Sequence, residues 1–583
     1  MKLDSPGDGV DPIGQHLNCA FDYFPSSFST SGKALMGLQA ANEGFLRAFL
    51  RYGRLPSCVA QVRNAQEVEQ FRALVADVCG PQQPVEHLFA DDQAGLARVG
   101  ALLHPFPGFG HLAWNRQFGG AASYSLLGIT HTTATQAVMD SIGNLAIAPI
   151  QPWDAVVCTS RAVRATYETV LELWEEHLRQ RLGATRLPRP QLPIIPLGVD
   201  TSWIAPASAA SRQSWRTRLK IPAAAFVVLW VGRFNHAAKA HPIPTYLALE
   251  QLAQRLEQPV VYLQAGWFGN EAIQQAFTAA AQRWAPSVHH LFVDGRQPEL
   301  RQQIWHAADV FCSLSDNLQE TFGLTPIEAM AAGLPVVVSD WDGYRDTVRD
   351  GIDGFRVPTT MPAAGYGQGL AHRFCAQTIS YDYYCAVTAQ TVAVDLPATV
   401  RALEILATQP ELRQQQGAAG RQRALETYGW EVVIGQYQQL LEELADRRVE
   451  AGHEDIFPKK SCPAKVPLRF DPYKTFDSYP SFSLENNSGV ALEICWRKST
   501  PKELDIYLEA LYSDPLHNFA SKYRLPLELC KVLVSSLSRK PEACIYKLLS
   551  QPPVNGFGYG DAVTMATIAW LIKVGILQRC DDL

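Results

Sequence analysis

The stretch "ADVFCSLSDNLQETFGLTPIEAMAAGLPVVVSDW", residues 308–341, decides the fold of the chain. It begins and ends with an apolar run, and each run is typical of a buried strand. Between the runs, Thr325, Pro326 and Glu328 fit the N-cap, N1 and N3 positions of a helix rich in small residues. A strand, a helix and a second buried strand predict two parallel strands joined by a crossover helix.

The same alternation of strand and helix patterns extends outward from this stretch. In the half that surrounds it, strands are predicted at residues 225–234, 259–267 and 289–295, and helices at 243–257, 270–284, 298–307 and 429–448. In the preceding half, strands are predicted at 58–64, 111–117, 124–131, 154–160 and 192–200, and helices at 34–53 and 160–183. The predicted fold class is therefore α/β, with two doubly wound Rossmann-like domains facing a cleft. Ligands of such sheets bind beyond the carboxyl ends of the strands.

Lysine usage divides the chain. Up to about residue 450 the basic residues are almost all arginine, whereas lysines are frequent afterwards. The segment between the two regimes is rich in proline and charge and has no helical period. We therefore predict four parts: an acceptor-side domain, a ligand-binding domain, a linker and a small α-rich accessory domain that is winged-helix-like, at residues 1–205, 206–450, 451–480 and 481–583.

Composition excludes several classes of protein. The 583 residues carry a net charge of −6, so we expect no nucleic-acid partner. For the accessory domain we favour support of the other domains or binding of a partner. The 12 cysteines form no CxxC pair, which indicates reduced thiols and a cytoplasmic protein. The N-terminus has no signal-peptide pattern, and no apolar run is as long as a membrane span. Peripheral contact with a membrane stays open, as does the oligomeric state.

Two carboxylates flank the predicted turn before the central helix. Gly323 would let this turn aim backbone N–H groups into the cleft, where a phosphate or sugar hydroxyls could bind. Glu320, at the mouth of the turn, would then contact sugar hydroxyls or a cationic transition state; the alternative is a solvated loop carboxylate. Glu328 has two readings as well, since Thr325 and Glu328 together also fit a capping box that needs no ligand.

Two cations follow the first strand of the second domain. Arg233 and Lys239 lie just after the apolar run that ends near Gly232, where a phosphate-binding group is expected. Arginine offers a fork for two phosphate oxygens, and lysine a point charge. Lys239 is unusual because this part of the chain so rarely uses lysine; the alternative is an ordinary surface lysine.

These residues carry a resemblance to a known family. The segments "GRFNHAAKAHP" and "ETFGLTPIEAMAAGLPVVVSDWDGYRDTVRDGIDGFRVP" resemble the nucleotide-sugar half of family 4 retaining glycosyltransferases of the GT-B fold, within the glycosyl transferases group 1. Glu320 and Glu328 meet the E-x7-E signature of that family. The resemblance is specific over about residues 225–360 and looser over 20–200, and it does not extend beyond about residue 450.

The resemblance implies a role for each matched residue. Glu320 would contact the donor sugar near its reacting carbon, and Glu328 would bind the ribose hydroxyls. Arg233 and Lys239 would neutralise the leaving diphosphate, and His131 would line the cleft near the sugar. The remaining matched residues would bind the donor. The backbone of Phe322, Gly323 and Leu324 would bind the sugar hydroxyls, and Leu324 and Thr325 would bind the distal phosphate. Gly37 would contact the donor phosphates, and the base would be bound by Asp294, Gly295 and Arg296.

The sequence departs from the family pattern at two places. Ala240 follows Lys239 where the family has glycine, and the N-terminal glycine-rich loop is reduced to Ser31-Gly32 and Gly37. Without the resemblance, His131 would be interpreted as a satisfied core or loop histidine, and Gly37 as a close-packing glycine in a helix.

The triplet Asp340-Trp341-Asp342 spells the DxD motif by which glycosyltransferases of another fold hold a divalent metal ion. Here two cations and a helix N-terminus are already expected at the diphosphate. We therefore interpret Asp340 and Asp342 as loop carboxylates and predict neither a metal nor another cofactor.

The predicted reaction is metal-independent transfer of a sugar from a nucleotide diphosphate sugar to an acceptor hydroxyl, with retention at the anomeric carbon. The alternative is a non-catalytic nucleotide-sugar-binding protein on the same scaffold. The base stays open between UDP, GDP and ADP. The acceptor is open between a lipid-linked saccharide, a polysaccharide, a small metabolite and a protein.

Overall fold

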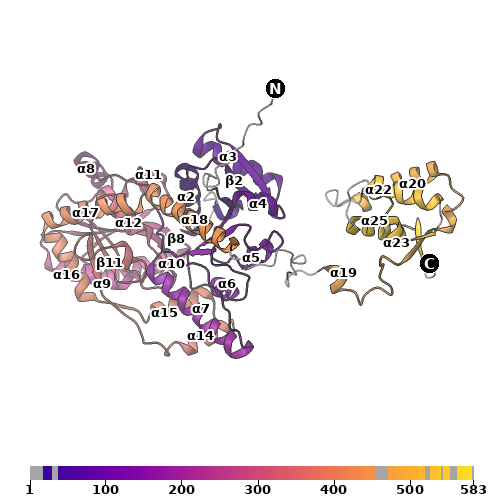
Figure 1. The fold of residues 1–583 in the computed structure, drawn as a ribbon. Coiled ribbons are helices and arrows are strands. Elements are labelled where there is room, and N and C mark those ends of the chain that lie inside the picture. Colours follow the sequence, from indigo (N-terminus) through magenta and orange to yellow (C-terminus); the bar gives the residue numbers. More distant parts are fainter. Residues whose placement is uncertain are drawn as a thin grey trace, which may run out of the picture. The chain divides into compact units, whose positions relative to one another are not determined.

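The computed structural model describes residues 18–28, 37–453, 466, 471–518, 526–539, 542–551, 554 and 561–580. The chain forms two compact units, Met1–Leu468 and Arg469–Leu583 (Figure 1). The Ser31-Gly32 pair and most of the predicted linker, residues 454–465 and 467–470, lie outside the described residues.

The first half of the large unit is a six-stranded parallel sheet in the order β3-β2-β1-β4-β5-β6. Its strands are β1 Ala20–Asp22, β2 Cys58–Val62, β3 Val85–Phe89, β4 Ala101–His104, β5 Ser125–Ile129 and β6 Ala155–Val157. Its helices are α1 Pro25–Phe28, α2 Gly37–Tyr52, α3 Ala65–Cys79, α4 Gln93–Val99, α5 Gly110–Arg116, α6 Gln136–Leu145 and α7 Arg161–Leu182. Ala20 pairs with both Val59 and Leu102, so the strand order reverses between β1 and β4.

Two predicted strands of this half are wrong. Residues 111–117 lie in helix α5, whose inward face buries Leu112, Ala113 and Arg116. Periodicity cannot separate so short an apolar run from a buried helix segment. Residues 192–200 form no strand and make only the isolated bridges of Ile194 with Cys158 and of Val199 with Gly429.

The second half repeats the architecture with the sheet order β12-β11-β10-β7-β8-β9. Its strands are β7 Phe226–Phe234, β8 Val260–Phe268, β9 His289–Asp294, β10 Val310–Ser313, β11 Val336–Ser339 and β12 Gly354–Val357. The helices are α8 Ala209–Arg218, α9 Pro242–Arg255, α10 Glu271–Trp284, α11 Pro298–Gln303, the 3-10 helix η1 Ile304–Ala307, α12 Leu324–Ala331, α13 Tyr344–Thr347, α16 Leu396–Thr408 and α17 Pro410–Tyr428. Here the strand order reverses between β7 and β10, and the strands predicted in this half are confirmed.

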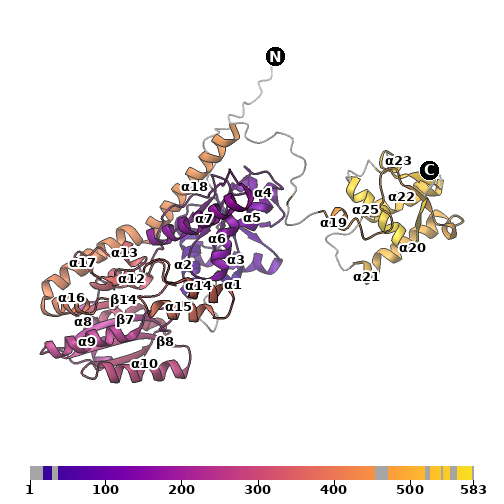
Figure 2. The ribbon, with the colours of Figure 1, turned by 90° about the horizontal axis from the view of Figure 1, so that it is seen from below.

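Helix α18, Trp430–His453, carries the chain back from the second half to the first (Figure 2). Its apolar side chains Val433, Ile434 and Tyr437 belong to the same buried cluster as Phe45 and Phe49 of α2. This burial stabilises the contact between the two halves, because apolar area is removed from water on both sides. The two predicted Rossmann-like domains are therefore halves of one compact unit.

An inserted helical hairpin was not predicted. Helices α14 Gln368–Cys375 and α15 Tyr381–Ala389 lie between the short strands β13 Thr359–Thr360 and β14 Ala393–Val394, which pair antiparallel. The pair closes the base of the hairpin. In both views the hairpin lies beside helices of the first half (Figures 1 and 2).

The small unit combines helices with a three-stranded antiparallel sheet, in the order β16-β15-β17. Its strands are β15 Gly489–Leu492, β16 Glu542–Cys544 and β17 Leu577–Cys580. The helices are α19 Pro472–Thr475, the 3-10 helix η2 Ile494–Trp496, α20 Pro501–Ser513, α21 Pro515–Asn518, α22 Leu527–Arg539, α23 Ile545–Leu549 and α25 Asp561–Lys573. The small unit is rich in helices, as predicted for residues 481–583, but its sheet was not predicted.

No helix within the described part of the chain is both long enough and apolar enough to cross a membrane. Most of the described cysteines are buried, but Cys375 and Cys495 are exposed, so the expectation that the thiols are buried is wrong at these two positions.

Candidate functional site

The candidate site lies where the strand order of the second sheet reverses. Strands β7 and β10 are parallel neighbours, so the loops that follow them emerge side by side at the carboxyl edge. The carbonyl of Lys239 accepts hydrogen bonds from the Asn317 side-chain amide and, at 3.4 Å, from the Ser315 hydroxyl. The backbone N–H of His241 donates to both carboxylate oxygens of Asp316, at 3.2 and 3.3 Å. These bonds attach one loop to the other.

The attachment brings Lys239 and Glu320 together. The Lys239 Nζ lies 3.6 Å from Glu320 Oε2, with the two side chains 35% and 15% exposed. The side-chain oxygen of Asn317 accepts hydrogen bonds from the backbone N–H groups of Gln319 and Glu320, at 2.9 and 3.2 Å, which holds the backbone that carries the glutamate. A cation and a carboxylate therefore share a partly exposed edge of the sheet.

The turn after Glu320 requires a glycine. Gly323 has φ of +88°, and a Cβ built there would overlap the ring of Tyr344. Helix α12 then begins at Leu324 with Gly323 at its N-cap and no side-chain cap. The capping-box interpretation of Thr325 and Glu328 is therefore wrong, because the N-cap lies two residues earlier than expected. The uncapped N–H groups of its first turn suit an anion or hydroxyl oxygens.

Glu328 therefore does not cap helix α12, which was the alternative to a role in ligand binding. Its side chain is half-buried, and it forms no hydrogen bond or ion pair with any residue that the structure describes. Burial raises the pKa of this carboxyl, and the charge of Arg301 opposes the shift. The ribose-binding role stays a prediction, and the half-buried carboxylate is available for a ligand.

Arg233 lies inside β7 rather than after it. The strand continues two residues beyond the apolar run that ends at Gly232, and Arg233 pairs with Trp267 of β8. The Arg233 Cζ is 5.9 Å from the centroid of the Trp267 ring. The guanidinium is thus supported by an aromatic face near the carboxyl edge of the sheet.

Buried aromatic side chains support the turn between Glu320 and α12. The Phe322 side chain is buried and packs 6.0 Å, centroid to centroid, from the ring of Tyr428. Only the backbone of Phe322 can therefore serve a ligand, as the prediction for it requires. The Tyr344 hydroxyl lies 3.0 Å from the Ser313 hydroxyl at the end of β10. The roles predicted for Leu324 and Thr325 also rest on backbone groups and stay predictions.

The first half meets the second at this turn. The Thr321 hydroxyl donates to the carbonyl of His131 at 3.0 Å, and the Ser160 hydroxyl donates to the carbonyl of Thr321 at 2.9 Å. Burial lowers the pKa of His131 to about 4, against a hydrogen bond with the backbone of Pro105 that favours the charged form. Its Nε2 is buried and has no hydrogen-bond partner among the described residues. The structure therefore brings the backbone of His131, whose imidazole is buried and neutral, to the residue next to Glu320.

The other sequence-predicted residues lie farther along the fold. Asp294 ends β9, two strands away from β7, and its carboxylate forms an exposed ion pair with Arg296 at 2.8 Å. The hydrogen bonds of Arg296 hold the pKa of Asp294 below its usual value. Gly295 donates its N–H to the Gly266 carbonyl at 3.0 Å. Gly37 is the first residue of α2. Their roles at the base and the phosphates stay predictions.

The two carboxylates of the DxD triplet differ. Asp340 forms ion pairs with Arg356 at 3.3 Å and with Arg345 at 3.7 Å. Asp342 lies in the turn after β11 with φ of +42°, and its Oδ1, like that of Asp340, is buried without a hydrogen-bond partner among the described residues. Burial raises the pKa of Asp342 well above its usual value, and the charge of Glu320 adds to this. Among the described residues, no cluster of three histidine, cysteine, aspartate or glutamate side chains could hold a metal ion.

A second polar cluster was missed from the sequence. At the strand reversal of the first sheet, His104 Nδ1 lies 2.7 Å from Asp22 Oδ2, and Arg63 donates to Asp22 Oδ1 at 2.6 Å. His104 and Arg63 together hold the pKa of Asp22 below its usual value against desolvation. Arg63 lies near the end of the strand predicted at residues 58–64, which was an available signal. The strands that end at Asp22 and His104 were not predicted, so their proximity could not be inferred.

Comparison with known proteins identifies part of the chain. The sequence model of the family described as "Glycosyl transferases group 1" matches residues 211–365. A D-inositol 3-phosphate glycosyltransferase of Geodermatophilus obscurus is 35% identical over 183 residues, 29% of this chain and 37% of that protein. A phosphatidyl-myo-inositol mannosyltransferase of Mycobacterium tuberculosis is 31% identical over 179 residues, 30% of this chain and 43% of that protein.

These matches confirm the resemblance to glycosyltransferases over the second half, while the chain spans about two fifths of the length of the curated relatives it matches. Solved structures with a similar arrangement include HepE of Anabaena in complex with UDP and glucose, at a TM-score of 0.47 and 14% identity, covering 73% of this chain and 100% of that one. The sucrose-phosphate synthase of Thermosynechococcus elongatus has a TM-score of 0.44 at 16% identity, covering 74% and 99%.

Proposed function

We propose that the protein is a metal-independent, retaining glycosyltransferase that moves a sugar from a nucleotide diphosphate sugar to an acceptor hydroxyl. The observation that carries the proposal is the pairing of Lys239 with Glu320 beside the uncapped start of α12. The match of residues 211–365 to glycosyl transferases group 1 supports the reaction class.

The donor diphosphate would bind through charge and backbone groups. The first turn of α12 supplies N–H groups and the positive end of a helix dipole. Lys239 and Arg233 add two positive charges from the adjacent strand, which stabilise the diphosphate as negative charge develops on it. The 3.6 Å separation of Lys239 from Glu320 is long for an ion pair, so the ammonium can turn toward a phosphate at little cost.

The sugar would lie between Glu320 and the first half of the large unit. Glu320 would accept hydrogen bonds from its hydroxyls, and the neutral His131 would offer its unpartnered Nε2 from the opposite side. Retention would follow from attack on the same face as the departing diphosphate, which would itself take the acceptor proton. Cationic and backbone stabilisation of the leaving group supports this route.

Metal independence is supported by the state of the DxD triplet. Asp340 is engaged by Arg345 and Arg356, and a metal ion would have to displace both guanidinium groups. Lys239 and Arg233 already supply the charge that a divalent cation would bring to the diphosphate. We place the reaction in the cytoplasm, in keeping with the reduced thiols expected from the sequence.

The test is donor binding and hydrolysis with UDP-, GDP- and ADP-sugars, with and without EDTA, followed by NMR assignment of the anomeric product. One nucleotide should be released slowly from its sugar donor, at a rate that EDTA does not change. The anomeric configuration of the product should be that of the donor. Release should be slower in Glu320→Ala and Lys239→Ala. Binding of a donor without turnover by any acceptor or by water would favour the non-catalytic alternative. Loss of release in EDTA would overturn metal independence alone, and absence of binding would overturn the whole proposal.

A further inference from the structure

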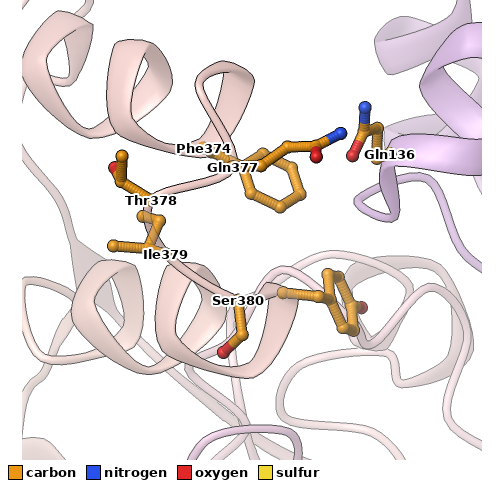
Figure 3. Close-up of a pocket in the computed structure, with 7 residues that line it drawn as sticks. Gln136, Phe374, Gln377, Thr378, Ile379 and Ser380 are labelled. Carbon is orange, nitrogen blue, oxygen red and sulfur yellow. The ribbon is translucent and has the colours of Figure 1, made fainter.

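A cavity of about 410 Å³ lies between the inserted hairpin and the first half of the large unit. Gln136, the first residue of α6, lines one side, and the link between α14 and α15 lines the other (Figure 3). In the close-up, the Gln136 and Gln377 side chains point toward one another across the opening, with the Phe374 ring beside them. The full lining is Gln136, Phe374, Gln377, Thr378, Ile379, Ser380 and Tyr381.

Contacts within the hairpin hold the residues that line the cavity in place. The rings of Phe374 and Tyr384 are stacked with centroids 4.4 Å apart and an interplanar angle of 12°. Thr378 donates its N–H to the carbonyl of Arg373 at 3.0 Å, and Ser380 caps α15. Gln377 has φ of +56°, a conformation that is costly for glutamine and persists only where the surroundings impose it.

The chemistry of the lining is neutral and rich in hydrogen-bonding groups. Two carboxamides offer both donors and acceptors, and the hydroxyls of Thr378, Ser380 and Tyr381 do the same. Aromatic rings supply flat apolar surface. No charged side chain lines the cavity. Such a wall suits the hydroxyls and C–H faces of a sugar ring, and it offers no cation to a phosphate.

Buried polar side chains connect the cavity with the candidate site. Tyr381 lines the cavity, and the Thr132 side chain lies within its reach and lowers the pKa of its phenol against the effect of burial. Thr132 follows His131, whose Nε2 is buried and has no hydrogen-bond partner within the described residues. Thr321, which bonds to His131, precedes the turn at Gly323 and follows Glu320.

Unpartnered buried polar groups are rare, because each costs about 1–3 kcal/mol. A ligand hydroxyl would satisfy the buried His131 Nε2. A saccharide that extends from the hairpin cavity along Tyr381 and Thr132 would approach this histidine.

We propose that the cavity between the hairpin and α6 is an acceptor subsite that takes a neutral, unphosphorylated saccharide. The proposal rests on the glycosyltransferase function proposed above and names the substrate class of that site. Gln136 and Gln377 hydrogen-bond hydroxyls of the outer sugar unit, and Phe374 packs against its ring. Tyr381 and Thr132 direct the reacting end toward His131.

The test is equilibrium binding by saturation-transfer NMR on the full chain, without donor. The probes are maltose, lactose and methyl α-glucoside, each set against glucose 6-phosphate and inositol phosphate. We compare the wild type with Gln136→Ala, which removes one exposed side chain at the start of a helix. The matched control is Tyr366→Ala, an aromatic that is 85% exposed just before α14 and outside the cavity.

At least one neutral saccharide should bind the wild type and the Tyr366→Ala control alike, and about fivefold more weakly in Gln136→Ala. Donor binding should be equal in all three proteins. Preference for a phosphorylated probe, no binding of any probe, or equal binding by Gln136→Ala would each overturn the acceptor assignment. Failure of the wild type to bind any nucleotide sugar would overturn the proposed function. The saccharide titration is carried out without donor, so it would still show whether the cavity binds a saccharide.

Discussion

Lys239 Nζ lies 3.6 Å from Glu320 Oε2, although the two residues belong to loops that follow different strands. Strands β7 and β10 are neighbours only because the order of the sheet reverses between them. The pair is thus produced by topology, and it lies at the edge where ligands of such sheets bind.

Replacing Lys239 by methionine should lower kcat by about 100-fold or more, because a positive charge aimed at the leaving diphosphate is lost. Lys239→Arg should retain part of the activity, since it restores charge without the same geometry. Single-turnover kinetics with the identified donor measures both. The thermal midpoint should barely change, since this partly exposed pair contributes little stability. Equal rates for the methionine and arginine variants would contradict a charge role.

Replacing Gly323 by alanine should destabilise the large unit by about 2–4 kcal/mol, since the residue has φ of +88° and faces the Tyr344 ring. Donor affinity should fall as well, because the turn that begins α12 would shift. The control is Gly435→Ala in α18, where no atom approaches the added methyl group and alanine favours the helix. Urea unfolding should show the first variant weakened and the second equal or stronger.

Replacing Asp316 by asparagine should stabilise the protein above pH 7 and have little effect near pH 4. Burial raises the pKa of Asp316 to about 7 from an ordinary 3.8. Between these values the folded protein holds a proton that the unfolded chain has lost, so stability falls as the pH rises through this window. Asparagine has no proton to lose, and the gain at pH 8 should be about 2 kcal/mol.

Denaturant titrations at pH 4.5, 6 and 8 measure the effect of Asp316→Asn, with the exposed Asp91→Asn as control. The control should follow the wild type throughout. A constant difference between Asp316→Asn and the wild type at all three pH values would show that the carboxyl is ionised in the folded protein, contrary to the prediction.

Replacing Asp346 by alanine should weaken the contact between the two halves of the large unit. Its carboxylate accepts from the backbone N–H and the side chain of Arg161, both at 2.6 Å. We expect a several-fold higher KM for the donor and a loss of less than about 1 kcal/mol in stability. The control is Glu404→Ala, which breaks the Arg255–Glu404 pair of 2.8 Å inside the second half. An unchanged KM for Asp346→Ala would show that this contact does not govern donor binding.

Much of the site could be identified before its geometry was known. Lys239 was conspicuous because lysine is rare in its half of the chain, and Glu320 and Glu328 because of their spacing around a turn. The position of Arg233 was approximately right. What failed was local detail: the capping box of Thr325 and Glu328 is absent, since Gly323 in a left-handed conformation lets the helix begin earlier.

Other features had no local signal. The hairpin of α14 and α15 interrupts the strand-helix alternation, and helix α14 has no fully buried residue. The cluster of Asp22, Arg63 and His104 joins three strands, two of which are too short to show a period. The Asp342 carboxyl was interpreted as a loop carboxylate, and its burial beside Glu320 and Ser160 had no local signal, because both residues lie far from it in the sequence.

The sequence by itself determined the two strand-and-helix halves and the resemblance of residues 211–365 to glycosyl transferases group 1, because hydrophobic period and a turn motif are properties of neighbouring residues. The tertiary structure alone decided which polar groups meet: Lys239 with Glu320, Thr321 with His131, and Gln136 with the hairpin. The reason is physical. Partners far apart in sequence are set by the order of strands in a sheet and by the packing between halves, and neither leaves a periodic trace in the chain.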